Sequence, residues 1–535
     1  MDPALFRDDI ESKTKDAAAV QANLLSQMME LNGETEYLRR YGGRFDSLPI
    51  IEYHDVADEV QRIANGDTSP ILTAEPVVRF FKSSGTVTGE PKLIPATSKS
   101  LELLFRRPVY MMESDVCLGF LFAKPENKSP GGLPVSTTSS MFFKVQGENL
   151  EKMFTSPMKL LLAPDINQSL YCQLLCGLIR SEDVTQVFAA LAITLVEALR
   201  LLEEAWSELA DDVQTGTLNS KITDPTLRSS LSLCLRPNLK LAQSIRKECT
   251  ADNAWCGIVE RLWPKTKVIV TITTGGMAPY APAVRKYGGS VPIVSGDYVC
   301  TECVLGFNLD PFCPPESVSF TIHPEYAYYE FLHYPQKLTD GSTVKLVDVK
   351  VGEEYELVVS TWSGLYRYKV GDIVRVTGFH NFSPNISFVH RLNAELDIAG
   401  ERSTEAELQV AVQKSQHCLP ASQELVDFTC HQDGQRYLIF WEIKNGDSLN
   451  PMILETCCCV LDTSLTERYK QRRENGLIGP LRLCIVRGKT FKALQQYSLE
   501  KGINPTQYKT PRCITSPEMI AILQAGITQD CQTPA

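Results

Sequence analysis

The run TKVIVTITT, which ends at Gly275 and Gly276, constrains the fold more than any other stretch of the chain. β-Branched residues fill this run and a glycine pair ends it, as is typical of a buried strand. It predicts a strand over residues 266–273. Stretches with the helical spacing of apolar residues lie elsewhere in the same chain, so strands and helices are mixed. The fold class that this mixture predicts is α/β or mixed α+β.

Patterns of both kinds continue through the first 380 or so residues. Apolar spacing predicts helices over residues 10–40, 97–115, 169–179 and 181–210. Thr97 or Ser98 is the expected N-cap of the second helix, and the apolar stretch from Val187 to Val196 is predicted to be buried helix. Further strands are predicted at residues 291–295, 318–322, 344–349, 356–361 and 373–377. The last four strands are close together, which indicates a meander or a small β-barrel.

A domain boundary is predicted between residues 385 and 400. Helix patterns follow it at 404–416, 450–470 and 491–502, and strand-like runs follow it at 424–430, 436–443 and 481–486. These patterns predict a small α+β domain. We therefore divide the chain into a large domain, residues 1–392, and a small domain, residues 393–535. The polar tail at residues 507–512 contains a proline and is expected to be a loop.

Composition excludes several classes of function. The chain has 535 residues, enough for a large core, and its net charge of −11 argues against general nucleic-acid binding. The first residues are polar and acid-rich, unlike a signal or transit peptide. The longest helical apolar stretch is too short to span a bilayer. We expect a soluble, cytoplasmic monomer that contacts neither nucleic acid nor membranes.

The 17 cysteines are scattered along the chain, and without a signal peptide we expect them to be reduced. The consecutive cysteines at 457–459 are expected to pack within a helix. Cys300 and Cys303 form a C-x-x-C pair, but the sequence offers no second pair and no H-x-x-x-H. The pattern therefore predicts neither a zinc site nor a redox role.

The stretch SSGTVTGEPKLIP, residues 83–95, has the composition of an anion-binding loop. Gly85 and Gly89 allow the backbone to come close to a ligand, and Lys92 adds a positive charge. Hydroxyl donors are offered by Ser83, Ser84, Thr86 and Thr88. The stretch is neither a Walker A loop nor G-x-G-x-x-G, because two prolines intervene and the glycine spacing differs. An ordinary surface loop is the alternative.

Two further stretches suggest the remaining parts of a nucleotide site. In YRYKVGD, residues 366–372, Asp372 is able to accept hydrogen bonds from both hydroxyls of a ribose. In YVCTE, Tyr298 is able to stack on a base, and Glu302 is able to hold magnesium or a polar ligand edge. The alternatives are a surface hairpin with Asp372 in its turn, a packed tyrosine and a solvated glutamate.

With these stretches in place, the sequence resembles the plant GH3 family of acyl-acid amido synthetases, relatives of acyl-CoA ligases and firefly luciferase. The family motifs S-S-G-T-S-x-G-x-x-K-x-x-P, Y-x-S-S-E and Y-R-[YV]-x-[VL]-G-D stand here as SSGTVTGEPKLIP, YVCTE and YRYKVGD. The likeness extends over residues 10–520, including QYKTPRC near the end. It implies an adenylate-forming fold with β-barrel and β-sheet subdomains in the large domain and a mobile small domain.

The resemblance implies a two-step ligation that uses ATP and Mg2+. A small carboxylic acid of the plant-hormone type, such as jasmonate, indole-acetate or a benzoate, is adenylated and its acyl group is transferred to an amino acid. Carried over by motif, the nucleotide site comprises Ser83, Ser84, Gly85, Thr86, Thr88, Tyr298, Glu302 and Asp372. The expected catalytic residues are Lys92, Glu302, Arg402 and Lys509, with Glu302 also the expected magnesium ligand. A hinge is expected near residues 391–398.

The acyl pocket is expected to be apolar. Its predicted residues are Met111, Leu133, Val135, Leu175, Met277 and Tyr280. The alternative for Met111 and Leu175 is that they simply fill the core. Other readings of the whole chain are a different adenylate-forming ligase, such as one that makes a thioester, and a weakly active or non-catalytic binder of a hormone acid. The motive for the last is three departures from the family motifs, at Val87, at residues 300–301 and at Arg402.

Overall fold

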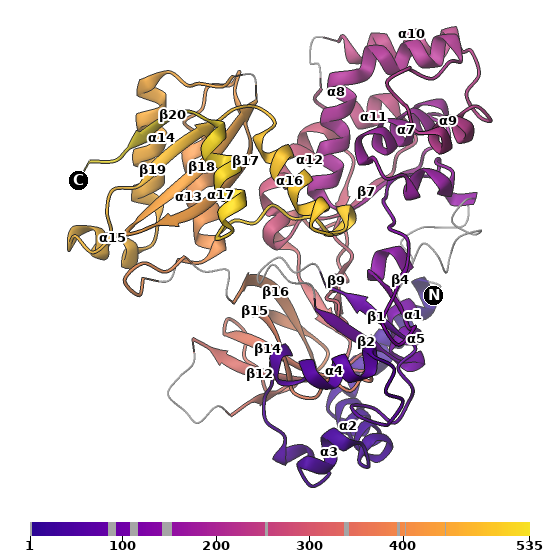
Figure 1. The fold of residues 1–535 in the computed structure, drawn as a ribbon, viewed down its shortest axis with the longest axis vertical. Helices are drawn as coiled ribbons and strands as arrows, with labels where there is room; N and C mark the ends of the chain where they lie inside the picture. Colours follow the sequence, from indigo (N-terminus) through magenta and orange to yellow (C-terminus); the bar gives the residue numbers. More distant parts are fainter. Residues whose placement is uncertain are drawn as a thin grey trace.

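The computed structural model describes residues 3–83, 92–106, 116–141, 152–251, 255–335, 342–392, 396–401, 403–444 and 446–534. Within these residues the strands form four sheets. Figure 1 shows the sheets and their helices in three groups, with the C-terminal group, orange to yellow, set apart from the other two. We call residues 3–392 the large unit and residues 396–534 the C-terminal unit.

An eight-stranded sheet, largely antiparallel, forms one half of the large unit. Its strand order is β13-β12-β14-β15-β16-β11-β10-β9. The bounds are β9 Asp297–Val299, β10 Val304–Phe307, β11 Phe320–Ile322, β12 Tyr328–Tyr334, β13 Val344–Lys345, β14 Glu354–Ser360, β15 Tyr368–His380 and β16 Ser383–Arg391. The order has two ends, so the predicted barrel takes the form of an open sheet in the described residues.

N-terminal helices and a small sheet pack against this eight-stranded sheet and share its apolar core. The helices are α1 Pro3–Lys15, α2 Ala17–Asn32, α3 Glu36–Arg40, α4 Ala57–Ala64 and α5 Ser98–Phe105. The small sheet has the order β2-β1-β5-β4, with β1 Arg79–Lys82, β2 Leu93–Ala96, β4 Asn127–Lys128 and β5 Pro134–Ser136. Its β1–β2 pair is an antiparallel hairpin, and the loop of residues 83–92 connects the two strands. The predicted anion-binding loop falls in the connection between β1 and β2, of which residues 84–91 lie outside the described residues.

A parallel sheet of order β3-β6-β7-β8 forms the other half of the large unit. Its strands are β3 Cys117–Phe120, β6 Gln186–Leu191, β7 Val268–Ile272 and β8 Ile293–Val294. The helices packed in the same core are α7 Ile166–Ile179, α8 Ala192–Thr215, α9 Pro225–Leu231, α10 Leu239–Cys249, α11 Ile258–Leu262 and α12 Ala281–Gly288. Figure 1 shows these magenta helices gathered around β7.

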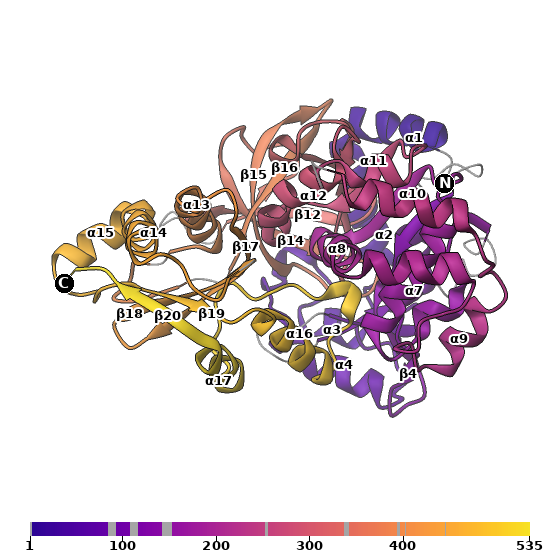
Figure 2. The ribbon, with the colours of Figure 1, turned by 90° about the horizontal axis from the view of Figure 1, so that it is seen from above.

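The C-terminal unit is a sheet of order β17-β18-β19-β20 with helices on both faces (Figure 2). Alternate residues of its strands enter two separate cores: Ile439 and Trp441 face one core, and Leu438 and Phe440 face the other. The strands are β17 Glu424–Asp433, β18 Arg436–Lys444, β19 Arg482–Val486 and β20 Ile527–Gln532. The helices are α13 Glu405–Gln416, α14 Pro451–Ser464, α15 Glu467–Glu474, α16 Thr490–Glu500 and α17 Pro517–Gly526.

Two helix predictions were wrong. The expected helix over residues 181–210, including Val187 to Val196, is instead strand β6 followed by helix α8. β6 lies between β3 and β7, so it is a central parallel strand, and its apolar run has no period that distinguishes it from buried helix. The expected helix over residues 10–40 is broken into α1, α2 and α3, with Asp16 between the first two and Thr35 as the N-cap of the third.

The helix expected over residues 97–115 is found only in part, because α5 ends at Phe105 with Arg106 as its C-cap and residues 107–115 lie outside the described residues. The strand expected at residues 344–349 is only the two-residue β13.

The remaining predicted elements fall close to their expected places. β7 lies within residues 266–273, and Thr97 caps α5 by accepting a hydrogen bond from the Ser100 N–H. All six elements predicted in the C-terminal unit are found within a few residues of their expected bounds, although the expected helix at 450–470 is two helices. Among the described residues, no helix combines the length and the apolar character needed to cross a membrane.

Candidate active site

Ser83 and Lys92 lie opposite each other where the predicted anion-binding loop leaves the β1–β2 hairpin. The Ser83 N–H donates to the Lys92 carbonyl at 3.0 Å, and the Lys92 N–H donates to Ser83 Oγ at 2.9 Å. These two bonds close the base of the loop. The predicted ligand residues Ser84, Gly85, Thr86 and Thr88, and the departure at Val87, lie outside the described residues.

The ammonium group of Lys92 lies between two tyrosines. It is 5.5 Å from the centre of the Tyr53 ring and 3.5 Å from the Tyr368 hydroxyl at the start of β15. Burial and the neighbouring Glu302 carboxylate raise the pKa of Tyr368, because both disfavour a second negative charge. Lys92, Tyr368 and Glu302 therefore come together from three separate segments, which places a cation beside a carboxylate.

Glu302 lies in the tight turn between β9 and β10. The Cys300 N–H donates to the Cys303 carbonyl at 3.0 Å, and the Cys300 thiol contacts the same carbonyl at 3.3 Å. Glu302 and its neighbours line a pocket whose walls include Phe81, Leu103, Leu104, Tyr326 and Trp362. The C-x-x-C pair thus forms the two ends of the turn that carries Glu302.

Asp372 is buried on β15, where it receives hydrogen bonds from two directions. Tyr298 Oη donates to one carboxylate oxygen at 2.7 Å, and Arg391 Nε donates to the other at 2.6 Å. Arg391 is the cross-strand partner of Asp372 on β16. Burial and the Asp372 charge hold the pKa of Tyr298 well above its usual range, so the phenol keeps its proton and donates it.

Lys509 comes from the C-terminal unit and approaches the same place. The surrounding protein lowers the pKa of Lys509 by taking away part of its hydration, and Arg391 lowers the pKa further, while Asp372 and Glu405 oppose this effect. Its side chain remains exposed to solvent, so the shift is moderated by water. Lys509 therefore lies within electrostatic reach of the Asp372–Arg391 pair.

Glu405 begins α13 and faces a glycine turn of the large unit. A Cβ on Gly276 would be 3.3 Å from Glu405 Oε1, so the helix start and the turn are close together. In the same turn Gly275 has φ +56°, and a Cβ there would be 2.8 Å from the Phe388 ring. Glycine is therefore required at position 275 by both backbone and space. Arg402, predicted to be catalytic, lies outside the described residues.

The residues predicted for the acyl pocket are divided between two apolar cores. Leu133 and Val135 belong to the core of the eight-stranded sheet, whereas Leu175, Met277 and Tyr280 belong to the core of the parallel sheet. Leu175 is fully buried, as its alternative packing role requires. Met111 lies outside the described residues. The pocket assignment stays a prediction.

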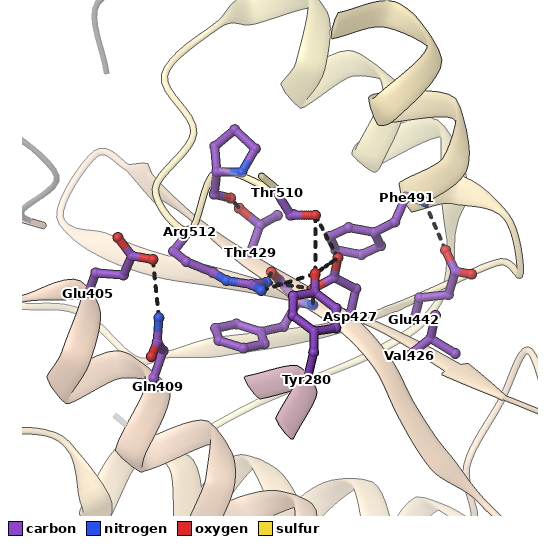
Figure 3. Close-up of polar contacts among 12 residues, drawn as sticks. Tyr280, Glu405, Gln409, Val426, Asp427, Thr429, Glu442, Phe491, Thr510 and Arg512 are labelled. Carbon is purple, nitrogen blue, oxygen red and sulfur yellow. Dashed lines mark hydrogen bonds and ion pairs between the residues drawn. The ribbon is translucent and has the colours of Figure 1, made fainter. Parts of the chain in front are cut away.

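The Tyr280 hydroxyl has partners that the sequence did not suggest. It donates to Asp427 Oδ2 of the C-terminal unit at 2.8 Å, and it also contacts Thr510 and Arg512 (Figure 3). Sequence reasoning also missed Tyr53, Tyr368 and Arg391 as site residues. For Arg391 a signal existed, because a hairpin register with its turn near Asn381 places it opposite Asp372.

The described residues contain no group of three or more histidine, cysteine, aspartate or glutamate side chains that could hold a metal by themselves. Glu302 is nevertheless a suitable single ligand for Mg2+. This ion commonly binds to one or two carboxylates together with substrate phosphates, and it keeps several waters. The donor set therefore fits a magnesium ion that arrives with a nucleotide rather than one held in a closed protein site.

Comparison with known proteins covers almost the whole chain. Family models described as the GH3 family N-terminal, central and C-terminal domains match residues 6–293, 320–391 and 406–518. The indole-3-acetic acid-amido synthetase GH3.3 of Arabidopsis thaliana is 38% identical, with 98% of this chain and 94% of the relative covered. The corresponding GH3.8 enzyme of Oryza sativa subsp. indica is 38% identical, with 98% and 93% covered.

A solved structure shows the same architecture. The AtGH3.15 acyl acid amido synthetase in complex with 2,4-DB matches with a TM-score of 0.88 and 36% identity, over 98% of this chain and 96% of that chain. The fold and the full-length likeness thus define a ligase of the class that forms amide bonds. The chain belongs to the GH3 family.

Proposed function

We propose that the protein is an ATP-dependent acyl-acid amido synthetase that works in two steps. In the first step the carboxylate of a small acid attacks the α-phosphorus of ATP, which forms an acyl-adenylate and releases pyrophosphate. In the second step the amine of an amino acid attacks the activated carbonyl, which forms the amide and releases AMP. A carboxylate is a poor electrophile, and AMP is a good leaving group, so catalysis consists largely of positioning and charge neutralisation.

The observation that carries this proposal is the convergence of distant segments at one place. Lys92 and Glu302 meet at Tyr368, four residues before Asp372 on the same strand. Asp372 is bonded to Tyr298 and Arg391, and Lys509 approaches this pair from the C-terminal unit. Cations, carboxylates and aromatic rings are the groups that a nucleotide and its phosphates require.

Lys92 and Glu302 form the proposed phosphate side. The Lys92 ammonium would attract the phosphate oxygens, and the hairpin bonds of Ser83 hold the loop where these oxygens arrive. Glu302 would hold Mg2+ through its single carboxylate. The metal, when bound, would neutralise charge that develops on the phosphates. We include Ser84, Gly85, Thr86 and Thr88 in this side by their motif positions.

Asp372 forms the proposed ribose side. Both of its oxygens are used by Tyr298 and Arg391, so a ribose diol would share or replace these donors. Breaking the Tyr298 bond would free a ring that lies next to Phe388 and Phe320 to turn its face toward adenine. Arg391, whose side chain is 37% exposed, would remain available to the nucleotide.

The C-terminal unit would supply Lys509 and Arg402. We propose that residues 393–535 move relative to residues 1–392 between the two steps, about a hinge near residues 391–398. Each step would then favour its own arrangement of the units. The arrangement described above, with Lys509 beside Asp372, brings a cation to the nucleotide and therefore suits the first step.

The acid is proposed to be of the plant-hormone type: indole-acetate, jasmonate or a benzoate. Curated relatives are named for indole-3-acetic acid, and the similar solved structure holds 2,4-DB. The acyl pocket is proposed to include Met111, Leu133, Val135, Leu175, Met277 and Tyr280. Leu133 is only partly buried and follows Gly132 near the β1 hairpin, which makes it the described member best able to contact a ligand.

The test is acid-dependent exchange of labelled pyrophosphate into ATP, measured without any amino acid. The panel comprises indole-acetate, indole-butyrate, jasmonate and several benzoates. Exchange with at least one acid, lost in Glu302→Gln and retained in the exposed control Glu34→Gln, would support the proposal. Amide formation would then be followed by product mass with a set of amino acids. Exchange with none of these acids, together with measurable acid binding, would identify a binder instead.

A further inference from the structure

A polar cluster joins the two units (Figure 3). The large unit contributes Tyr280, at the end of the short helix Gly275–Tyr280 before α12. The C-terminal unit contributes Asp427, Thr510 and Arg512, which we call the Asp427 socket. Tyr280 Oη donates to Asp427 Oδ2 at 2.8 Å and accepts from Arg512 Nη2 at 3.2 Å. Its ring is also 5.5 Å from the Arg512 guanidinium.

The socket is complete within the C-terminal unit. Asp427 accepts from Arg512 Nη1 and from the Phe428 N–H at one oxygen, and from Thr510 Oγ1 at 2.7 Å at the other. With Tyr280 these make four hydrogen bonds, which is the capacity of a carboxylate. Arg512 also donates to the Phe428 carbonyl and stacks over the Phe428 ring at 4.3 Å. The socket therefore stays assembled whether or not Tyr280 is in place.

Tyr280 can leave the socket only by giving up buried bonds. Its side chain is almost fully buried, and the hydroxyl is engaged as donor and acceptor at once. Burial and the Asp427 charge raise the pKa of Tyr280, so it remains a neutral donor at physiological pH. One phenol hydroxyl thus connects the large unit to a preformed and saturated group of acceptors and donors.

The socket also sits next to Lys509 in the chain. Thr510 and Arg512 belong to the socket, and the Arg512 carbonyl accepts from the Cys430 N–H of β17 at 2.8 Å. On the other side of Lys509, Tyr508 is buried in the core of the parallel sheet of the large unit. Thr506 Oγ1 donates to the Phe122 carbonyl at 2.7 Å. Lys509 is therefore the residue at which the tail passes from one unit to the other.

We propose that Tyr280 and the Asp427 socket form a releasable latch, and that this latch holds the arrangement in which Lys509 lies between Tyr508, buried in the large-unit core, and Thr510 of the socket. The inference rests on the proposed two-step function. The Tyr280 hydroxyl is a positioning group: it is bonded to Asp427 and acts through the placement of Lys509. The Tyr280 ring, which a phenylalanine would keep, is the part assigned to the proposed acyl pocket. When the latch is closed, the enzyme favours activation of the acid; when it opens, the C-terminal unit is free to adopt the arrangement used for the amine.

The decisive variant is Tyr280→Phe, which removes one oxygen atom and keeps the ring. Loss of one buried hydrogen bond should shift the balance of arrangements by about tenfold. We expect pyrophosphate exchange to slow by about that factor in kcat, with little change in KM for the acid. Amide formation from supplied acyl-adenylate should be unchanged or faster. Tyr171→Phe is the matched control, because it removes a buried phenol bond to Asp212 inside the large unit.

A second readout does not depend on activity. With the latch open, Lys509 should leave the surroundings that lower its pKa, so less of its amine is unprotonated. Its labelling by an amine-reactive ester, measured by peptide mass spectrometry without substrates, should therefore fall in Tyr280→Phe. Tyr171→Phe should label as the wild type does. If no acid supports exchange even in the wild type, the proposed function fails, while the labelling still tests the latch.

Equal ratios of the two half-reactions and equal labelling of Lys509 in Tyr280→Phe and Tyr171→Phe would overturn the latch. If Tyr280→Phe fails to fold, Thr510→Val tests the same cluster from the C-terminal unit. It removes the 2.7 Å bond to Asp427 and should shift both readouts in the same direction by a smaller factor. Thr510→Val without either shift would count equally against the proposal.

Discussion

Two buried aspartates in this molecule each bind a tyrosine and an arginine, yet we propose different roles for them: one binds a ligand and the other holds two units together. Tyr298–Asp372–Arg391 lies in the proposed nucleotide site, and Tyr280–Asp427–Arg512 lies where the two units meet. The residue types are the same. The two clusters differ in how many hydrogen bonds the aspartate already accepts and in how far the arginine is exposed to water.

The Asp427 carboxylate already accepts four hydrogen bonds, and the Arg512 side chain is 0% exposed. At Asp372 two side-chain donors are in place, and Arg391 is 37% exposed. A saturated, dry cluster is costly to disturb and suits holding parts together. A carboxylate with only two side-chain donors, one of them a partly exposed arginine, is able to exchange these donors for those of a ligand. The identity of the residues therefore does not decide the role; their surroundings do.

The largest effect should come from Arg512→Met. It would leave the Asp427 charge buried without a cation, which typically costs about 3–5 kcal/mol of unfolding free energy. Arg391→Met should cost about 1 kcal/mol, because water can replace an exposed guanidinium. Urea unfolding of both variants checks the difference. Equal losses would show that the two triads do not differ in the way described here.

Asp372→Asn should have the next largest effect, this time on catalysis. Losing charge-assisted acceptance from two ribose hydroxyls should lower kcat/KM for ATP by about a hundredfold, which corresponds to about 2.7 kcal/mol. Stability should change less than in Arg512→Met. Steady-state kinetics with ATP varied, at saturating acid and amino acid, measures this effect. An unchanged KM and kcat for ATP would remove Asp372 from the nucleotide site.

A third carboxylate, Glu197 on α8, differs from both aspartates because its side-chain hydrogen-bond donor is a neutral amide rather than an arginine. It accepts from the Gln495 amide of the C-terminal unit at 2.9 Å. Burial raises the pKa of Glu197 to about 7, against the Gln495 bond and the charges of Lys492 and Arg200. The folded protein therefore binds a proton here more tightly than the unfolded chain does. The protonated Glu197 carboxyl therefore stabilises the folded protein below pH 4.5, and this stabilisation should be lost as the pH rises from about 4.5 to 7.

Glu197→Gln should remove this loss. We expect the variant to be about 1–2 kcal/mol more stable than the wild type at pH 8 and equal to it near pH 4.5. Thermal unfolding across this pH range is the measurement. Glu208→Gln on the same helix is the control, since Glu208 is paired with Lys221 at 2.6 Å. A Glu197→Gln variant with the wild-type pH profile would contradict the prediction.

The smallest effect is expected at an exposed ion pair of the same interface. Lys286 Nζ lies 2.7 Å from Glu424 Oε2, with side chains 42% and 32% exposed. Lys286→Ala should cost about 0.5 kcal/mol in low salt, and the cost should vanish near 1 M salt. Urea unfolding at both salt concentrations checks this. A salt-independent cost would mean that the lysine stem, rather than its charge, matters.

Much of the fold follows from local patterns in the sequence. In the C-terminal unit, strands β18 and β19 alternate between two cores, and helix α13 starts at a capping box formed by Thr404 and Glu407. Local signals of this kind predicted the described strands and α-helices there except α17 and β20, for which no prediction was made. In the large unit, β6 was missed because a strand buried on both faces shows no alternation.

The candidate site was predictable only where a motif carried it. Lys92, Tyr298, Glu302, Asp372 and Lys509 were named from motif positions, and the structure places them in one region, although their roles remain proposals. Arg391 and Tyr53 carry no motif and depend on cross-strand register and on packing between segments. The Tyr280–Asp427 contact joins residues 147 positions apart. No local pattern encodes such a contact, because it arises from the docking of two units.

The tail around Lys509 has a geometric consequence. In the sequence the C-terminal unit follows the large unit after Leu392, and its own Tyr508 packs in a core of the large unit while Thr510 is bonded to Asp427. A rigid body held at two points can only rotate about the line through those points. While Tyr508 stays buried, the proposed movement of the C-terminal unit would therefore be a rotation about the line from the start of this unit to Tyr508. Removing Tyr508 from the core would allow movement in other directions as well.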